Sequence, residues 1–192
     1  MYGEQDRFPA EETHPTRPVS PYGVAKLSVE RYLYFYHVEY GLDATALRYA
    51  NVYGPRQNPH GEAGVVAIFL DRLLAGRDVV INGDGLQTRD YVFVGDVVVA
   101  NLAALGRPGF HTYNVGTSRE TTVVELFHHL AAAVGVNRPP THGPAKSGEQ
   151  RRSVISSNLL ERELGVRPHV AIEDGLAHTA AWFVTTVNRA RP

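Results

Sequence analysis

The segment Ser20–Tyr49, SPYGVAKLSVERYLYFYHVEYGLDATALRY, decides the fold class of this chain. Ser20 and Pro21 predict the start of a helix, because a serine hydroxyl caps free N–H groups and proline suits the first helical position. Gly41 is a typical residue for the end of that helix. Residues 43–49 then follow a tight turn with few polar side chains, which is typical of an interior strand in a parallel sheet. A helix that crosses over into such a strand predicts an α/β fold.

The helix predicted for Tyr22–Tyr40 carries apolar residues around most of its circumference instead of along one stripe. A helix with this pattern is expected to be buried on more than one side. We therefore expect it to pack against its own sheet and also against a partner subunit, so that the chain forms a homodimer through this helix.

Helices and strands continue to alternate along the rest of the chain. Residues 1–21 predict a loop, because they are rich in proline, threonine and charged residues. Asp96 is expected to cap one helix, and Thr122 with Glu125 has the spacing of a capping box. The expected helices are 65–74, 97–105, 122–135, 159–164 and 173–187, and the expected strands are 79–81, 91–94 and 112–115.

The composition excludes several classes of protein. The 192 residues are 43% hydrophobic and 20% charged, which is typical of a globular domain and not of a disordered or membrane-spanning chain. The formal net charge is -1, so there is no basic excess for nucleic-acid binding. The absence of cysteine excludes disulfides and thiolate metal sites and fits a reducing, cytoplasmic location. The nine histidines are dispersed, so we expect no metal.

Tyr22-Gly-Val-Ala-Lys26 is the sharpest candidate for chemistry. Residues four apart lie on one face of a helix, so the phenol and the ammonium can act on the same ligand. A nearby cation favours the phenolate, and such a tyrosine can take or return the proton of a sugar hydroxyl while a nicotinamide exchanges a hydride. Alone, the pattern is weak and fits better an aromatic packing residue beside a lysine whose stem lies along it.

Further motifs follow Ser20–Lys26 in a fixed order. They are Leu47–Gln57 (LRYANVYGPRQ), Asn82–Gly85 (NGDG), Gln87–Val92 (QTRDYV) and Asn114–Gly116 (NVG). Their order and spacing resemble the extended short-chain dehydrogenase/reductases, in particular the NAD-dependent nucleotide-sugar epimerase/dehydratase family and its UDP-glucose 4-epimerase-like members. The resemblance implies the C-terminal part of a Rossmann-type doubly wound parallel sheet plus a small α/β nucleotide-sugar-binding lobe.

The resemblance also implies a role for each matching residue. Tyr22 resembles the catalytic tyrosine, Lys26 the lysine that holds the nicotinamide ribose of NAD, and Ala50 the residue whose backbone passes beside the nicotinamide. The other matching residues would bind a UDP-sugar through its diphosphate, base or ribose; they are Asn51, Val65, Val80, Ile81, Asn82, Arg89, Glu149 and Arg152. Structural roles stay open for three of these, because Asn51 could cap a turn, Arg89 could pair with Asp90 or Asp96, and Val80 could lie in the core.

The family's Gly-x-x-Gly-x-x-Gly turn, which cradles the pyrophosphate of the dinucleotide, does not occur in these residues. We therefore expect an N-terminally truncated family member. Residues 1–60 would be the remnant of the NAD-binding Rossmann domain, and 61–192 mainly the substrate-binding lobe, with the strand near 112–115 returning to the Rossmann sheet. An N-terminal complementing fragment is then a further expected partner.

Three functions remain compatible with the sequence. The first is an NAD-dependent sugar-nucleotide 4-epimerase with hydride transfer at C4 and Tyr22 as the base. The second is a nucleotide-sugar 4,6-dehydratase of the same family. The third is a non-catalytic remnant that acts only as a binding or association module.

Overall fold

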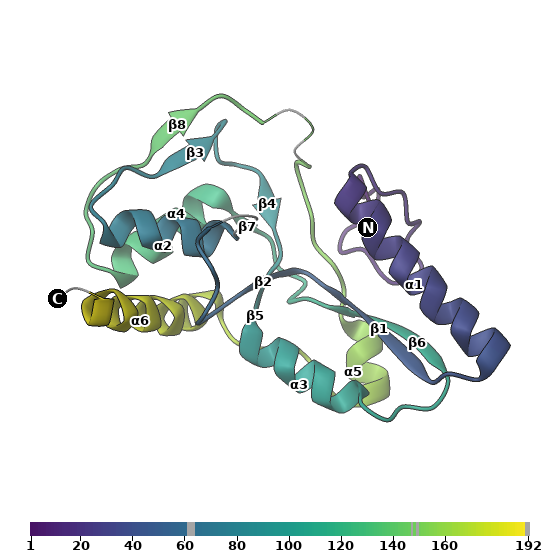
Figure 1. Ribbon diagram of the computed structural model, residues 1–192. Helices are drawn as coiled ribbons and strands as arrows, with labels where there is room; N and C mark the ends of the chain where they lie inside the picture. The colour runs from purple at the N-terminus through teal and green to yellow at the C-terminus, as the bar shows by residue number, and fades with distance from the viewer. Residues whose placement is uncertain (61–63, 147, 149, 191–192) are drawn as a thin grey trace.

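The computed structural model describes residues 1–60, 64–146, 148 and 150–190, and these form an α/β structure of six helices and eight short strands (Figure 1). The α/β class predicted from the sequence is confirmed. Among the described residues, every helix is too short or too polar to cross a membrane.

The deciding segment forms the predicted helix and strand, but in the described residues that strand pairs with one neighbour and is not the interior strand that the sequence predicted. Helix α1 spans Pro21–Tyr40, and the Ser20 hydroxyl accepts the Gly23 N–H at 3.1 Å, which caps its first turn. Gly41 ends the helix with φ 67°, a left-handed conformation that glycine adopts without strain. Strand β1 follows at Ala44–Tyr49. The chain therefore passes from the end of α1 into an edge strand after a turn of three residues.

Strand β1 pairs in parallel with β6 (Phe110–Val115), in a register that places Ala44 opposite Phe110 and Tyr49 opposite Val115. Helix α1 lies on one side of this pair, and α3 (Val94–Ala104) with α5 (Asn158–Leu164) lies on the other (Figure 1). The apolar residues between β6, α3 and α5 form one hydrophobic cluster: Val92, Val97, Ala100, Tyr113, Val115 and Leu160. This cluster fixes the part of the sheet that carries α1.

A second, larger cluster lies between three other helices, which gather on the opposite side of the molecule (Figure 1). They are α2 (Val65–Leu74), α4 (Val123–Ala133) and α6 (Ile172–Ala190). The parallel pair of β3 (Val80–Asn82) and β8 (Thr141–Gly143) flanks this cluster. The buried residues include Phe69, Leu70, Phe127 and Leu176.

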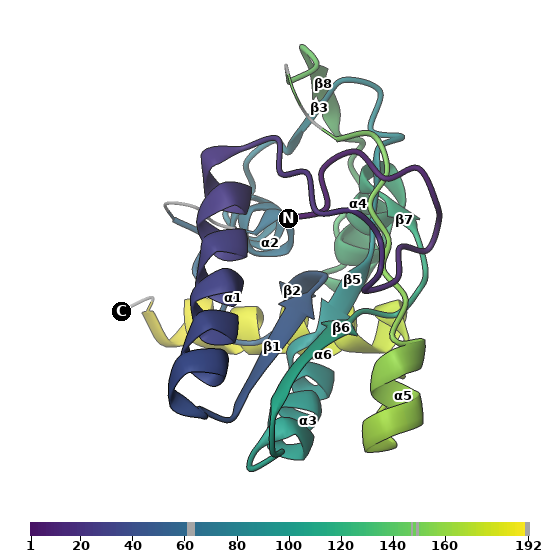
Figure 2. The same cartoon turned by 90° about the vertical axis from the view of Figure 1, so that its right-hand side faces the viewer.

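Two short strand pairs lie between the clusters. Strands β2 (Asn51–Tyr53) and β5 (Tyr91–Phe93) pair in parallel. Strands β4 (Thr88–Arg89) and β7 (Thr121–Thr122) pair antiparallel. The N-terminal segment also crosses to the end of the chain, because Ala10 forms a parallel bridge with Ile155; Figure 2 shows this segment looping away from α1.

One predicted helix boundary is wrong. The strand expected at 91–94 ends at Phe93, and α3 already begins at Val94, so Asp96 lies within the first turn and is not the cap. Its buried carboxylate instead accepts the backbone N–H groups of His169 and Val170, at 3.1 and 3.0 Å. The capping box of Thr122 and Glu125 is confirmed.

Within the described chain, α1 packs against its own sheet, as expected, and the burial of its remaining surface against a partner subunit stays a prediction. Only Gly23 and Glu30 of this helix are buried, and its apolar side chains are largely exposed: Val29, Tyr32, Tyr34, Phe35, Tyr36, Val38 and Tyr40. The physical reason is that α1 rests on β1 and β6 alone, and two strands are too narrow to cover more than one stripe of a helix.

Candidate functional site

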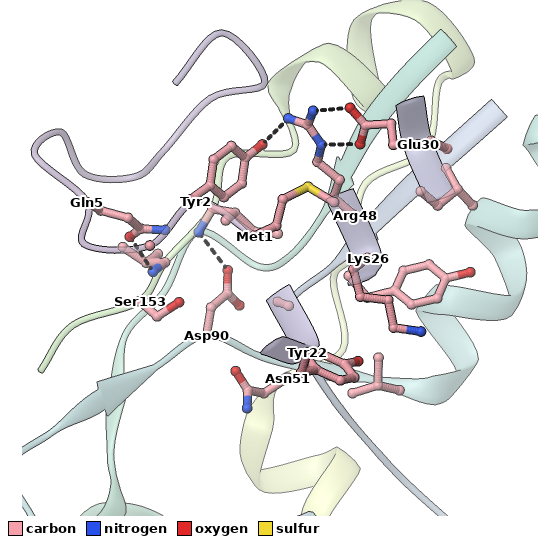
Figure 3. Close-up of a pocket in the computed structure, with 18 of the residues that line it drawn as sticks. Met1, Tyr2, Gln5, Tyr22, Lys26, Glu30, Arg48, Asn51, Asp90 and Ser153 are labelled. Atoms are coloured by element: carbon pink, nitrogen blue, oxygen red, sulfur yellow. Dashed lines mark hydrogen bonds and ion pairs between the residues drawn. The ribbon is translucent and has the colours of Figure 1, made fainter. Parts of the chain in front are cut away.

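A cavity of about 750 Å³ opens where the N-terminal segment, α1 and the end of β1 meet (Figure 3). Its walls come from Met1–Gly3 and Gln5, from α1 between Tyr22 and Leu33, from residues 45–52 and Asp90, and from Gln150 with Ser153–Ile155. Segments about 150 residues apart in the sequence thus line one pocket at the carboxyl end of a parallel strand pair, which is where α/β proteins commonly bind ligands.

Tyr22 and Lys26 both line this pocket from the first turns of α1. The Lys26 Nζ lies 5.3 Å from the centroid of the Tyr22 ring, so the two side chains are neighbours, as the spacing predicted. Tyr22 is 65% exposed, as Tyr32 is at 67% and Tyr40 at 73% farther along the helix. What distinguishes Tyr22 from these residues is its place in the pocket wall beside Lys26.

Ala50 and Asn51 reach the same pocket where the chain passes from β1 to β2. The Ala50 N–H donates to the Val115 carbonyl at 3.0 Å, and the Asn51 N–H donates to the Asp90 carbonyl at 2.8 Å. These backbone bonds fix the junction, and the Asn51 side chain lies near Tyr22 on the pocket wall (Figure 3).

Asp90 is a pocket residue that sequence reasoning considered only as a partner for Arg89. Its side chain is 2% exposed, and it accepts hydrogen bonds from the backbone N–H and the hydroxyl of Thr117 at 2.9 and 2.7 Å. The N–H groups of Ser118 and Ile155 donate to its other oxygen, at 3.2 and 3.4 Å. Burial raises the pKa of this carboxyl, while these donors oppose the rise.

A second polar network, around Arg48 of β1, forms part of the pocket wall. Its guanidinium donates to both carboxylate oxygens of Glu30, from Nε at 2.9 Å and from Nη2 at 2.5 Å. Its Nη1 donates to the Tyr2 hydroxyl at 2.7 Å, and that hydroxyl donates to Asn114 Oδ1 at 2.6 Å. None of these four residues was proposed from the sequence, because each contact joins positions far apart in the chain.

The other predicted site residues lie outside this pocket. In Arg89 the Nη1 donates to the Thr88 carbonyl at 2.8 Å. Val80 and Asn82 are exposed on β3, whereas the Ile81 side chain is 1% exposed in the core. Val65 begins α2 and packs against the same core.

Arg152 and Glu149 are the two remaining candidates. Arg152 donates from Nε to Glu120 at 3.0 Å and stacks over the Phe8 ring at 3.9 Å, and its hydrogen bond lowers the pKa of Glu120. Glu149 lies outside the described residues. The structure thus brings four of the predicted residues together in the pocket: Tyr22, Lys26, Ala50 and Asn51. The other described candidates lie outside it.

No group of three or more histidine, aspartate or glutamate side chains in the described residues is placed to hold a metal ion.

The parallel strands, the crossover helix and the paired tyrosine and lysine define a Rossmann-type α/β protein. The profile of the NAD dependent epimerase/dehydratase family matches residues 1–116. The chain therefore belongs to that family.

Individual relatives agree with this assignment. The UDP-glucose 4-epimerase of Mycolicibacterium smegmatis is 47% identical over 184 residues, which are 95% of this chain and 59% of that relative. A dTDP-glucose 4,6-dehydratase of an Actinoplanes species is 36% identical over 95% of this chain and 56% of its own length. The crystal structure of UDP-glucose 4-epimerase from Thermotoga maritima with UDP-glucose matches at a TM-score of 0.94 and 49% identity, over 97% of this chain and 60% of that one. The chain thus spans about three fifths of the proteins it matches.

Proposed function

We propose that this chain supplies the proton-transfer residues and the sugar-nucleotide lobe of an NAD-dependent UDP-glucose/UDP-galactose 4-epimerase. The observation that carries the proposal is the exposed Tyr22 phenol beside the Lys26 ammonium, in a pocket that Ala50 and Asn51 also line. The identity to an epimerase, 47% against 36% for the dehydratase, favours epimerisation over 4,6-dehydration.

The pocket residues fit the nicotinamide end of NAD. Lys26 offers an ammonium to a ribose hydroxyl, and the chain at Ala50 offers a wall of backbone and methyl group beside a flat ring. NAD, when bound, would accept a hydride from the sugar and later return it. No Gly-rich turn for its pyrophosphate occurs in the sequence, so that part of the cofactor would be held by residues outside this chain.

Tyr22 would act as the general base and then as the general acid. It takes the proton of the sugar's 4-hydroxyl as C4 is oxidised, and it returns the proton when C4 is reduced from the opposite face. Lys26 favours the phenolate form that this step needs, because it is a cation beside the phenol.

The sugar nucleotide would extend from this pocket toward the second lobe. Asn51 and Arg89 would bind the diphosphate, and Val65 with Val80, Ile81 and Asn82 would lie beside the base. For Ile81 the contribution would come from its backbone, because its side chain is in the core. Glu149 would contact the ribose, and Arg152 would bind a phosphate by sharing or leaving Glu120.

The division into residues 1–60 and 61–192 and the expected partners belong to the same proposal. The exposed aromatic face of α1 supports association, either with a second copy through Tyr22–Tyr40 or with an N-terminal complementing fragment. Sedimentation velocity at tens of micromolar tests the homodimer, and a clean monomer would contradict it.

The decisive experiment is a chimera in which the amino-terminal two fifths of the Mycolicibacterium smegmatis relative precede this chain. We expect the chimera, with NAD, to convert UDP-galactose to UDP-glucose. Tyr22→Phe keeps the ring but removes the proton acceptor, so kcat should fall by about 10²–10⁴-fold with little change in KM. An active chimera in which Tyr22→Phe keeps most of its kcat would refute the assignment, and a folded, inactive chimera would favour a non-catalytic module.

A further inference from the structure

The ion pair between Glu30 and Arg48 joins the helix that carries the candidate catalytic residues to the strand that leads into the pocket. Glu30 is 6% exposed, and among the residues of α1 it has the only buried side chain beyond glycine. Two donor nitrogens of Arg48 contact its two oxygens, at 2.9 and 2.5 Å. Figure 3 shows the pair among the residues that line the pocket, above Tyr22 and Lys26 in this view.

A charged residue at position 30 is unexpected on packing grounds. The stripe of α1 that faces the sheet also contains Leu27 and Leu33, both partly buried, so an apolar side chain would be the ordinary choice between them. Replacing a buried ion pair by apolar residues is often neutral or stabilising. Stability alone therefore does not account for the pair. A bidentate guanidinium–carboxylate contact constrains the relative position of the two side chains, because its two parallel hydrogen bonds form in one geometry only.

The guanidinium of Arg48 is itself held from two further sides. Its Nη1 donates to the Tyr2 hydroxyl at 2.7 Å and to the Glu12 carbonyl at 3.2 Å. Tyr2 is anchored in turn by Asn114, which is fully buried in β6. The carboxylate of Glu30 thus meets a donor whose position is set by the sheet and by the N-terminal segment.

We propose that Glu30 and Arg48 are positioning residues that fix α1 along β1 and so place the Tyr22 phenol relative to Asn51. Glu30 follows Tyr22 by two helical turns, about 12 Å along the axis, and Arg48 precedes Asn51 by about 10 Å of extended chain. The pair, which itself lines the pocket, therefore joins α1 to β1 about two helical turns from Tyr22 and three residues from Asn51. The effect of this ion pair on turnover depends on the proposed function. Its effect on the position of α1 does not depend on that function.

Spin-label distances test the placement on the 192-residue chain itself. The chain has no cysteine, so Ser28→Cys on α1 and Val98→Cys on α3, both exposed, give two clean labelling sites. We expect a narrow distance distribution in the otherwise unchanged chain. The Glu30→Met/Arg48→Met double variant should retain its thermal unfolding midpoint within a few degrees and show a broadened or shifted distribution.

Two variants and a control distinguish the effect of the bidentate hydrogen-bond geometry from the effects of charge and of overall stability. Arg48→Lys keeps the charge but loses the planar fork, so it should broaden the distribution as well. If the double variant does not fold, Glu30→Gln replaces it, and its distance distribution is compared with that of the unchanged chain. The control is Arg107→Met/Glu163→Met, which removes an ion pair at 2.7 Å between the α3–β6 loop and α5 and should leave the distances of α1 unchanged. An unchanged distribution in the folded Glu30 and Arg48 variants would overturn the proposal.

The chimera provides the second readout. A misplacement of about 1 Å costs about 10²-fold in rate, so kcat should fall by about that factor in Glu30→Met/Arg48→Met with KM little changed. Unchanged kcat in that variant would also overturn the positioning role. If the chimera with no substitution is inactive, the proposed function fails while the distance measurement still decides the placement of α1.

Discussion

Asp90→Asn is the substitution whose effect follows most directly from the structure. Asparagine has the shape of aspartate, so the change tests hydrogen bonding and charge without opening a cavity. Asp90 lies 2% exposed between Thr117, Ser118 and Ile155, and therefore ties the end of β6 to the C-terminal segment that closes the pocket.

The expected loss in the free energy of unfolding follows from the number of hydrogen-bond donors that lose their acceptor. An asparagine oxygen in the Oδ1 position keeps both bonds from Thr117, but its NH₂ group then faces the N–H groups of Ser118 and Ile155. Each lost bond to a charged acceptor is worth about 1.5–3 kcal/mol. The Ile155 contact is long, at 3.4 Å, and the neutral amide is cheaper to bury, so we expect a net loss of about 2–4 kcal/mol.

Thermal unfolding followed by circular dichroism measures this loss. For a chain of this size, the expected loss lowers the unfolding midpoint by roughly 5–15 °C. Thr117→Val is the matched control, because it removes one hydroxyl donor to the same carboxylate and should cost about 1 kcal/mol. If Asp90→Asn unfolds within about 0.5 kcal/mol of the unchanged protein, a range usual for surface substitutions, the carboxylate does not hold this junction.

Three other substitutions have expected outcomes. In the chimera, Lys26→Met should lower kcat and raise the dissociation constant of NAD measured by calorimetry; an unchanged NAD affinity would contradict a ribose contact. Arg89→Ala should raise KM for the UDP-sugar before it lowers kcat, because a diphosphate contact is present in both ground and transition states. In the separate chain, hydrogen bonds from Arg151 lower the pKa of Asp84 to about 2 from 3.8, so this carboxylate contributes stability above about pH 4 that is lost as the pH falls toward 2. Arg151→Ala should return the pKa toward 3.8 in a carboxyl titration by NMR, and an unmoved pKa would show that Arg151 is not its cause.

Local signals predicted the helices well because they depend on residues close in sequence. Ser20, Pro21 and Gly41 define α1 at both ends, and the capping box of Thr122 defines the start of α4. The α3 boundary was misplaced because Asp96 meets its backbone partners more than seventy residues later in the chain, near Val170. Strands of two or three residues, such as β4 and β7, are too short to show an alternating pattern.

The residues of the site also fall into those that a local sequence pattern reveals and those that only the tertiary structure reveals. Tyr22 and Lys26 form a pattern within one helix, so the sequence shows them directly. Glu30 and Arg48 carry no local signal, because a glutamate on a helix and an arginine in a strand are ordinary surface residues until the fold brings them together. Asp90 is likewise inconspicuous until Thr117 and Ile155 converge on it. Buried polar networks are properties of the tertiary structure, and periodicity does not reveal them.

The bridge between Ala10 and Ile155 has a consequence for how the chain acquires its pocket during synthesis. Gln5 accepts a hydrogen bond from the Val154 N–H, across a separation of 149 residues, so one wall of the pocket leaves the ribosome long before the other. Contacts of such long sequence separation form slowly, because the chain must close a large loop before they contribute any stability. Helix α1 and the β1–β6 pair can form earlier, with the N-terminal segment still undocked. The pocket is therefore expected to close only after residues 150–155 are made, and until then the first twenty residues stay undocked and accessible to proteases and chaperones.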